Sequence, residues 1–457
     1  MSNDAADKSG ENPQANPSLK QTFTITDNRT NKSSEFPIIP ATQGREGVDL
    51  SKLLSEFNVY GIAPGYQGLG AVQSSITYID GDVGRLEHCG YPIEELAERS
   101  STYLEVYHLL KHRELPTQSE LYDLEEYARA NCEIPNSVLN NIRTFSPNAE
   151  PMAILSSAMN SLSEHIKPDE EDKIIAVFPG IVANVIRHVQ GMELMQANKS
   201  LEYTERFAGI ALADRYGRYE SNPTVTDLLR KLMIVHADHE QNASTTTVRT
   251  VTSTKERLLG SIAAGILALE GPAHGGAAVD VQVELQKMYE HGEPAHFIRR
   301  AKDKADPYKL AGFGHRIYKN HDPRAKVVQE AVYKLYEEMG IDDDLLKFAK
   351  KVEEMVLADP YFSDRKLYPN VDWQTGNAYL ALGLPSKVFS SMFALGRVGG
   401  WIAQALEQDN KIYRPYQVYT GATTRPYVEL NERNGDDHNH AGIDVESDPV
   451  LEMKEPN

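Results

Sequence analysis

The segment from Leu258 to Leu269 constrains the fold more than any other, because it is uncharged and apolar on every side of a predicted helix. We therefore expect a helix that is buried all round. Glycine and proline then end the helix, and His274 follows in the sequence Gly271-Pro272-Ala273-His274-Gly275-Gly276. Such small residues allow a substrate to approach the backbone closely, with the imidazole as the only polar side chain. The alternative interpretation is a buried turn with one hydrogen-bonded histidine.

A second segment, Thr224 to Gln241, starts with apolar residues at helical spacing and continues the same stripe with His236 and His239. Histidines three apart face one way on a helix, and Asp238 and Glu240 stand beside them, so the segment also suits a metal. The strong zinc motifs, however, place their histidines four apart with a glutamate between them. Three interpretations remain for this segment: substrate recognition, histidines satisfied in the core, and a metal site.

A third segment, residues 312–326, combines two glycines, His315 and a cluster of basic residues. Asp322 is suited to cap a helix that begins at Pro323, which places Arg324 in the first turn. The backbone donors of a helix start and an arginine together favour an anion. The chain is acidic overall, with 47 basic and 66 acidic residues, so this local reversal of charge predicts a small anionic ligand. A solvated basic helix face is the alternative.

A fourth segment, residues 366–373, carries the single acid Asp372 between apolar residues, and its simplest role is to cap the helix that follows. A long apolar run from Val388 to Leu406 comes next, with Arg397 near its middle. The run is almost long enough to span a membrane, but the central arginine favours a buried helix whose arginine meets an anion. Arg414 adds a further cation in a turn that contains proline.

Short strands are expected only near the N-terminus. Residues 21–26 alternate like a strand, and residues 75–79 lead into Asp80-Gly81, a tight-turn sequence from which 83–88 can return. Beyond Pro92 the apolar residues follow helical spacing.

The net charge of −19 argues against general nucleic-acid or anionic-membrane binding. The N-terminus resembles neither a secretory nor a transit peptide, so we expect a cytoplasmic protein. The two cysteines, Cys89 and Cys132, stand in unrelated surroundings and predict neither a disulfide framework nor a cysteine metal site.

Taken together, four separated segments resemble citrate synthase, and the bacterial (type II-like) enzyme most: residues 236–244, 271–276, 312–324 and 367–372. The sequences at 76–82, at Arg414-Pro415 and at 419–421 agree with the same family. The match runs in family order over roughly residues 20 to 430.

The resemblance implies a mainly α, two-domain citrate synthase-like fold with a short N-terminal β region, in which a smaller domain closes over a cleft. The expected parts are a disordered N-terminus at 1–20, a β-containing region at 21–90, the first part of a large helical domain at 91–276, a small domain at 277–385, the return of the large domain at 386–430 and a polar C-terminal tail at 431–457.

The resemblance also implies a citrate (Si)-synthase-like acyltransferase, which joins acetyl-CoA to oxaloacetate and hydrolyses the thioester to give citrate and CoA, the first step of the tricarboxylic acid cycle. Asp372 would take a methyl proton from acetyl-CoA, His274 would hold the enolate oxygen, and His315 would polarise and protonate the ketone. The residues expected to bind oxaloacetate are His239, Arg324, Arg397 and Arg414, the last in the site of a neighbouring subunit. Arg316 and Lys319 are expected to contact CoA.

These residue types suit that chemistry. A thioester methyl is a very weak acid, so the charge of its enolate has to be stabilised by a donor that is already in place. A neutral histidine can donate without first becoming a strong acid. Oxaloacetate carries two carboxylates, and the fork of an arginine fixes both the orientation and the charge of a carboxylate.

Three departures from the family pattern lie close to the expected cleft: Ala278, residues 373–375 and Tyr416. They leave open a preference for propionyl-CoA, which would make the protein a 2-methylcitrate synthase. Two further alternatives are a metal-dependent hydrolase built on His236, His239 and His274, and a non-catalytic homologue. We expect no metal or other cofactor, no nucleic-acid or membrane partner, and a homodimer or a dimer-based higher oligomer.

Overall fold

The computed structural model describes residues 21–409 and 411–433, and the expectations for 1–20 and for nearly all of 431–457 lie outside this range. The chain forms two compact units. Of the described residues, the first contains 21–39, 47–67 and 414–433, and the second contains 40–46, 68–409 and 411–413. Every predicted site residue except Arg414 lies in the second unit.

The first unit is built on a three-stranded antiparallel sheet, as the alternation at 21–26 predicts. Its strands are β1 (Thr22–Asp27), β2 (Lys32–Ile39) and β3 (Gly47–Val48), followed by helix α1 (Leu53–Phe57) and the 3-10 turn η1 (Pro64–Tyr66). Phe36 of β2 packs on Phe57 of α1, with ring centroids 6.1 Å apart. Near the end of the described chain lies a further 3-10 turn, η4 (Leu430–Glu432).

The second unit begins with another small antiparallel sheet, made of β4 (Thr77–Asp80), β5 (Arg85–His88) and β6 (Tyr91–Pro92). Thr77 pairs with His88 and Asp80 pairs with Arg85. The predicted hairpin is therefore confirmed, although residues 81–84 form a four-residue loop instead of a two-residue turn at Asp80-Gly81.

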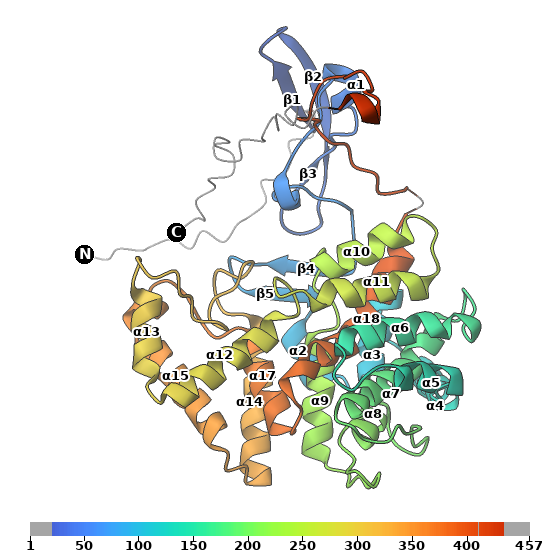
Figure 1. Ribbon diagram of the computed structural model, residues 1–457, viewed down its shortest axis with the longest axis vertical. Coiled ribbons are helices and arrows are strands. Elements are labelled where there is room, and N and C mark those ends of the chain that lie inside the picture. The colour runs from blue at the N-terminus through green and yellow to red at the C-terminus, as the bar shows by residue number, and fades with distance from the viewer. Residues whose placement is uncertain (1–20, 410, 434–457) are drawn as a thin grey trace. The chain divides into compact units, whose positions relative to one another are not determined.

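Helices make up most of the remainder, which confirms the mainly α class (Figure 1). They are α2 (Ile93–Arg99), α3 (Tyr103–His112), α4 (Gln118–Ala130), α5 (Asn136–Thr144), α6 (Pro151–Ser161), α7 (Glu171–Val189), α8 (Tyr203–Ala211), α9 (Pro223–Val235), α10 (Ala243–Thr252), α11 (Leu258–Glu270), α12 (Ala277–His291), α13 (Pro294–Lys302), α14 (Pro323–Met339), α15 (Asp344–Ala358), α16 (Pro360–Ser363), α17 (Val371–Ala381) and α18 (Phe389–Glu407), with 3-10 turns η2 (Leu162–Glu164) and η3 (Ser386–Val388).

Helix α18 runs through the main core and packs against α3, α7, α9, α10 and α11. It is buried from Phe389 to Ala405, as its apolar sequence predicts. Small residues allow the close packing, because a Cβ on Gly400 would lie 2.0 Å from the carbonyl oxygen of Ala237. None of the described helices is long and apolar enough to cross a membrane.

Helix α11 is not buried all round, contrary to the prediction from the apolar segment 258–269. One stripe, which includes Ala264, Leu267 and Ala268, is not buried in the single chain, and Leu267 is 50% exposed. The other faces pack against α6, α10 and α18. The sequence shows that no side of the helix is polar, but it does not show how many sides the chain's own helices cover.

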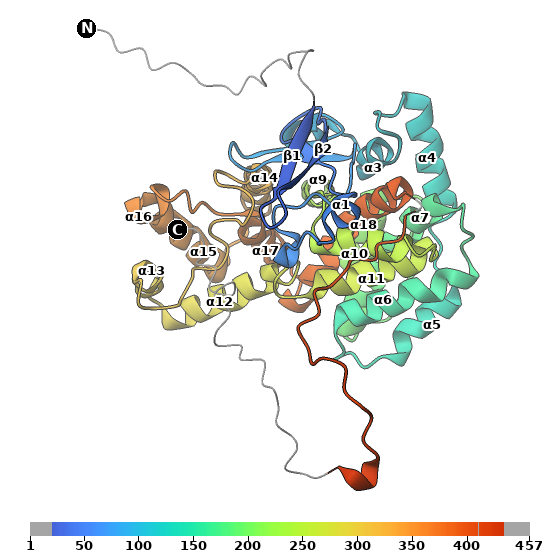
Figure 2. The ribbon, with the colours of Figure 1, turned by 90° about the horizontal axis from the view of Figure 1, so that it is seen from above.

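A second hydrophobic cluster lies within residues 277–385. Side chains from α12, α13, α15, α16 and α17 form it, including Leu285, Phe297, Val352, Phe362 and Trp373. In Figures 1 and 2, helices α12, α13 and α15 lie together on one side of the second unit, and α4, α5, α6 and α7 lie on the other. Figure 2 shows α16 on the same side as α13 and α15. The boundaries at 277 and 385 stay a prediction, since residues 68–413 form one compact unit.

Candidate active site

His274 stands in the turn between α11 and α12. The turn closes when the His274 N–H donates to the carbonyl oxygen of Gly271 at 2.8 Å. A Cβ on Gly275 would lie 2.5 Å from the Leu269 side chain, and one on Gly276 would lie 2.7 Å from the carbonyl oxygen of Glu270. The glycines after His274 are therefore needed because the turn folds tightly against the end of α11.

The His274 ring is held by the start of α10. Its Nε2 lies 2.9 Å from Ser244 Oγ. That hydroxyl accepts a 3.3 Å hydrogen bond from the indole Nε1 of buried Trp401 and donates to Asn242 Oδ1 at 2.8 Å. Burial, and then the positive charge of Arg397, lower the pKa of His274 to about 4. The imidazole is therefore neutral near pH 7, and Nδ1 is the ring nitrogen left for a ligand.

His315 lies in an irregular segment whose backbone requires glycine. Gly312 and Gly314 have φ angles of 85° and 81°, in the left-handed region that other residues rarely adopt. The segment is bound to residues 368–370: the Gly314 N–H donates to the Tyr368 carbonyl at 2.8 Å, and the Asn370 N–H donates to the Gly312 carbonyl at 2.9 Å. Two motifs that are far apart in the sequence thereby lie side by side.

The hydrogen bonds of His315 determine its tautomer. Its Nδ1 accepts from the backbone N–H groups of Ile317 at 3.0 Å and of Tyr318 at 3.2 Å. A nitrogen that accepts carries no hydrogen, so the neutral ring has its hydrogen on Nε2. Burial, and then the charge of Arg324, lower the pKa of His315 to about 4. His315 is thus a neutral hydrogen-bond donor near pH 7.

Asp372 is the second residue of α17, but it is not the cap. The Asn370 side chain caps the helix by accepting from the N–H groups of Asp372 at 3.0 Å and Trp373 at 3.2 Å. Within the described residues, the Asp372 carboxylate has no hydrogen-bond partner. Burial raises its pKa to about 6, against the opposing effect of Arg324. A partly buried, unpartnered carboxylate with this pKa is suited to accept a proton.

His239 is joined to the His315 segment through Tyr318. The His239 Nε2 and the Tyr318 hydroxyl are 3.0 Å apart, and the rings of His239 and His315 have centroids 6.0 Å apart. Burial and the charges of Arg324 and Arg397 keep the pKa of His239 well below its ordinary value. Sequence reasoning missed Tyr318, because the 312–326 pattern singles out its histidine and basic residues and not its tyrosine.

Arg324 occupies the first turn of α14, as predicted, and forms a buried ion pair with the N-cap residue Asp322. Its Nε donates to Asp322 Oδ1 at 3.0 Å and its Nη2 to Oδ2 at 2.9 Å. Although burial opposes charge on both groups, the pairing raises the pKa of Arg324 and lowers that of Asp322. The pairing leaves Nη1 of Arg324 for a ligand.

Arg397 is buried inside α18. Its Nε donates to the His236 carbonyl oxygen at 2.7 Å, but its Nη1 is buried without a partner among the described residues. Burial lowers the pKa of Arg397 to about 10, although the nearby Asp238 carboxylate opposes this shift. A buried charged donor with nothing to bind is unfavourable, so it indicates a ligand site for an anion.

The metal interpretation receives no support from the histidine positions. His236 uses Nδ1 to bond the Leu232 carbonyl at 2.7 Å, His239 bonds Tyr318 and His274 bonds Ser244. Across residues 21–409 and 411–433, no group of three or more His, Cys, Asp or Glu side chains is arranged to hold a metal ion.

The remaining predicted residues are placed as follows. Arg316 and Lys319 are exposed in the segment after His315. Arg414 belongs to the first unit, whereas the other predicted site residues belong to the second. Two of the departing residues point into the core: Ala278 is buried, and Trp373 is buried with its Nε1 donating to Glu353 at 2.8 Å.

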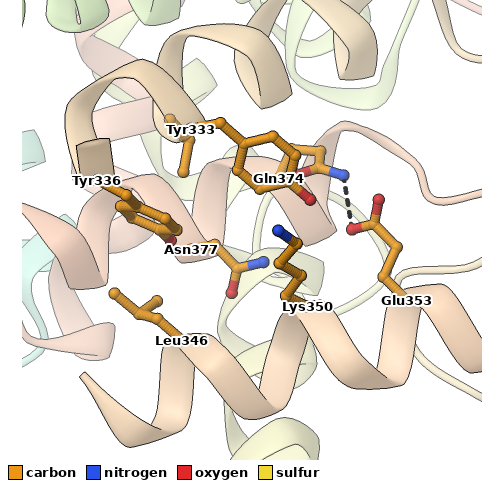
Figure 3. Close-up of a pocket in the computed structure, with 8 residues that line it drawn as sticks. Tyr333, Tyr336, Leu346, Lys350, Glu353, Gln374 and Asn377 are labelled. Atoms are coloured by element: carbon orange, nitrogen blue, oxygen red, sulfur yellow. Dashed lines mark hydrogen bonds between the residues drawn. The ribbon is translucent and has the colours of Figure 1, made fainter. Parts of the chain in front are cut away.

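A small pocket lies between α14, α15 and α17. Figure 3 shows it between residues of α14, α15 and α17, with Lys350 and Asn377 pointing into it. Glu353 at its edge accepts from Gln374 at 3.0 Å. None of the predicted site residues lines this pocket, whose side chains instead come from α14, α15 and α17, the helix that carries Asp372.

Comparison with known proteins gives a consistent result. Residues 65–416 match the family model described as the C-terminal domain of citrate synthase. The citrate synthase of Corynebacterium glutamicum is 43% identical over 416 residues, which cover 87% of this chain and 95% of that protein. Citrate synthase 1 of Mycobacterium tuberculosis is 41% identical over 415 residues, which cover 87% of this chain and 96% of that protein.

Solved structures agree. Citrate synthase from Pyrobaculum aerophilum superposes with a TM-score of 0.74 at 34% identity, covering 81% of this chain and 95% of that chain. The enzyme from Thermoplasma acidophilum, in a ternary complex with carboxymethyl coenzyme A and oxaloacetate, gives a TM-score of 0.74 at 29% identity, covering 82% of this chain and 100% of that chain.

Proposed function

The chain belongs to the citrate synthase family, and from this premise we propose that His274, His315 and Asp372 are the catalytic residues of its active site. The protein condenses acetyl-CoA with oxaloacetate and water to give citrate and CoA. The observation that supports the assignment of residues is the pairing of two segments: backbone hydrogen bonds join 312–314, next to the neutral donor His315, to 368–370, next to the unpartnered carboxylate Asp372.

The Asp372 carboxylate accepts the methyl proton of acetyl-CoA. With a pKa of about 6, its carboxylate is ionised near pH 7 yet basic enough to accept a proton. His274 holds the developing enolate oxygen with its Nδ1 hydrogen. This role requires the Ser244 hydroxyl, which donates to Asn242 Oδ1 at 2.8 Å, to turn and donate to His274 Nε2, 2.9 Å away. A pKa of about 4 keeps the ring neutral.

The enolate carbon then attacks the ketone of oxaloacetate. His315 is oriented to polarise that ketone and to protonate its oxygen, because Nδ1 is occupied by two backbone donors and the hydrogen is on Nε2. Water subsequently hydrolyses the citryl thioester and releases CoA.

The two carboxylates and neighbouring oxygens of oxaloacetate are bound by His239, Arg324 and Arg397, with Arg414 from a second copy of the chain. The unpartnered Nη1 of Arg397 supports this assignment, since a substrate carboxylate would satisfy a buried cation. The exposed Arg316 and Lys319 are assigned to the phosphates of CoA. No cofactor is required by this scheme.

A homodimer, or an oligomer built from dimers, follows from the same reasoning. The exposed stripe of α11 carries Ala264, Leu267 and Ala268, an uncharged surface of small and apolar residues that a second copy would cover. The cytoplasmic location stays a prediction.

Acetyl-CoA, and not propionyl-CoA, is the acyl donor of this proposal. Two of the residues that raised the alternative, Ala278 and Trp373, are buried, and the Trp373 indole is bonded to Glu353. Trp373 also belongs to the second hydrophobic cluster, so its bulk contributes to the packing of that cluster.

The test is thiol release from acetyl-CoA and from propionyl-CoA, each with and without oxaloacetate, with the product identified by mass spectrometry. We expect rapid release only from acetyl-CoA with oxaloacetate, with citrate as product and no loss in the presence of a chelator. Rapid release without oxaloacetate would instead indicate a thioesterase, and faster release from propionyl-CoA a 2-methylcitrate synthase.

A further inference from the structure

The loop of the β4–β5 hairpin lies directly against the segment that follows His315. The Lys319 N–H donates to the Gly81 carbonyl oxygen at 2.7 Å. Gly81 is so close to this segment that a Cβ there would lie 2.2 Å from the carbonyl oxygen of Ile317. A side chain at position 81 would therefore force the Gly81 or Ile317 backbone to move, because neither the added Cβ nor the carbonyl oxygen can rotate away.

A second glycine of the loop makes the same kind of contact. Gly84 has a φ of +76°, and a Cβ there would lie 2.4 Å from the carbonyl oxygen of His321. The two glycines thus contact the two ends of residues 317–321, a segment that belongs to a distant part of the sequence. Both positions require glycine for close approach, and Gly84 also requires it for its backbone conformation.

The hairpin loop is itself firmly built. The Asp80 carboxylate accepts from the N–H groups of Asp82 at 3.0 Å and Val83 at 3.3 Å, and the Gly84 N–H donates to the Asp80 carbonyl at 3.0 Å. The loop is therefore a fixed surface on which another segment can be aligned.

The segment that it contacts has no regular structure of its own. Residues 303–322 form neither a helix nor a strand, apart from an isolated bridge between Phe313 and Pro369. Residues 312–314 are held by 368–370, as described above, and the hairpin holds the other half, 317–321. His315 lies between these two supports.

The contact with Gly81 reaches His315 through a single peptide group. The Ile317 carbonyl and the Tyr318 N–H belong to the same planar unit, so they move together. The Gly81 backbone packs against that carbonyl, and the N–H donates to His315 Nδ1 at 3.2 Å. A displacement at Gly81 therefore alters a hydrogen bond that determines the tautomer of His315.

We propose that Gly81 and Gly84 are positioning residues for His315: their backbones align residues 317–321 so that two N–H groups meet Nδ1 and the ring hydrogen stays on Nε2. The inference rests on the proposed function, in which that hydrogen is donated to the ketone. The hairpin loop thus contributes to catalysis through its backbone and not through a side chain that touches the substrate.

Gly81→Ala and Gly84→Ala test the proposal, each with a matched control. Gly70→Ala places a Cβ in open space, and Gly292→Ala does so at the same φ of +76° as Gly84. We expect kcat per folded molecule to fall roughly 10- to 100-fold in both test variants, as a small misplacement of a catalytic group does. The controls should stay within about twofold of the parent, as ordinary surface substitutions do.

The second measurement is the nitrogen spectrum of the protein labelled with ¹⁵N-histidine, which reports the tautomer of His315 without any turnover. We expect the Nε2–H form in the parent and both controls, and a mixture of forms in the test variants. Asp80→Ala, which loosens the loop without adding an atom, should change the spectrum in the same direction and keeps the test available if an alanine at 81 or 84 prevents folding.

A parent spectrum that persists in every variant, or a loss of activity that only follows the folded fraction, would overturn the proposal and leave the hairpin as a packing element. A parent protein that fails to make citrate would overturn the proposed function, but the tautomer measurement would still decide the role of the two glycines.

Discussion

Asp322 receives two hydrogen bonds from the guanidinium of Arg324, at 3.0 and 2.9 Å, and both side chains are almost completely buried. The carboxylate does more than pair with the arginine: its Oδ1 also accepts from the Arg324 N–H, and its Oδ2 accepts from the Val371 N–H at 3.2 Å. One buried carboxylate therefore joins a residue proposed to bind oxaloacetate to the start of the helix that carries Asp372.

Asp322→Asn should destabilise the protein strongly. Both carboxylate oxygens face N–H donors, so either orientation of the asparagine places its NH2 group against another donor and leaves Arg324 without a countercharge. Breaking a buried pair in this way costs about 3–5 kcal/mol of unfolding free energy. The control is Glu330→Gln on the same helix, whose exposed contact with Lys326 at 3.8 Å should contribute less than about 1 kcal/mol. Chemical denaturation measures both.

The difference in unfolding free energy between the parent and Asp322→Asn should depend on pH, with a definite sign. The pKa of Asp322 is lower in the folded protein than in the unfolded chain, so its contribution to stability is complete above the unfolded carboxyl pKa, about 3.9. It is lost as the pH falls below that value. The gap between the parent and Asp322→Asn should therefore shrink in acid, and a gap that widens there would contradict the ion pair.

Asp372 should control the acid side of the pH–rate profile. We expect kcat/KM to fall below about pH 6, the pKa of Asp372, as its carboxylate is protonated. His274 and His315, each with a pKa of about 4, stay neutral through that range and should not contribute. Asp372→Asn should reduce turnover drastically while calorimetry still detects oxaloacetate binding. An equally steep loss of binding would make Asp372 a structural or substrate-binding residue.

The same substitution should stabilise the protein at neutral pH. A carboxyl pKa raised from 3.8 to about 6 means that the charged form is unfavourable in the folded state, so Asp372 lowers stability as the pH rises through this interval. The shift corresponds to at most about 3 kcal/mol. A higher Tm for Asp372→Asn than for the parent at pH 7, with no difference near pH 3, is the expected result.

The motifs in the sequence predicted the helical class, the hairpin and the N-cap at Asp322, which the structure confirms, and they supplied the candidate residues of the site, which stay a prediction. They could not predict the partners that give those residues their properties. The position of Asp372 before an apolar segment suggests a helix cap, but Asn370 performs that role and leaves the Asp372 carboxylate without a partner among the described residues. Tyr318, which joins His239 to the His315 segment, and Gly81, which lies against the same segment, act through contacts between distant parts of the chain.

The sequence also did not show which side chains are exposed and which are already paired. Helix α11 is apolar on every side, yet Leu267 is 50% exposed because the chain's own helices cover only its other faces. Arg324 shows the converse: a basic residue at a helix start suggests a free cation, but two of its nitrogens are already bonded to Asp322.

Ser244 should determine the tautomer of His274. Its hydroxyl lies 2.9 Å from His274 Nε2 and accepts from the Trp401 indole at 3.3 Å. In the proposed role this hydroxyl turns from Asn242 Oδ1, its acceptor at 2.8 Å, to donate to Nε2 and keep the ring hydrogen on Nδ1. Ser244→Ala removes that donor, so kcat should fall roughly 10- to 100-fold with little change in the KM for oxaloacetate. Thr247→Ala is the control, because this hydroxyl of the same helix bonds only its own backbone, at Ala243. A loss confined to KM would contradict this role.

The last prediction concerns Arg414, which lies in the first compact unit and is proposed to complete the site of a second copy. A site that already holds Arg324 and Arg397 accepts another cation only when the two carboxylates of oxaloacetate balance the charges. We therefore expect His274→Ala and Arg414→Ala each to be inactive as homodimers.

Mixed dimers of these two variants, coexpressed with different tags and purified through both, should recover activity. One site of the mixed dimer receives both lesions, whereas the other has an intact His274 from its own chain and an intact Arg414 from its partner. The expected activity is therefore about half that of the parent per dimer, provided that the two sites act independently. If mixed dimers form normally but remain as inactive as the two homodimers, Arg414 acts within its own chain or lies outside the site.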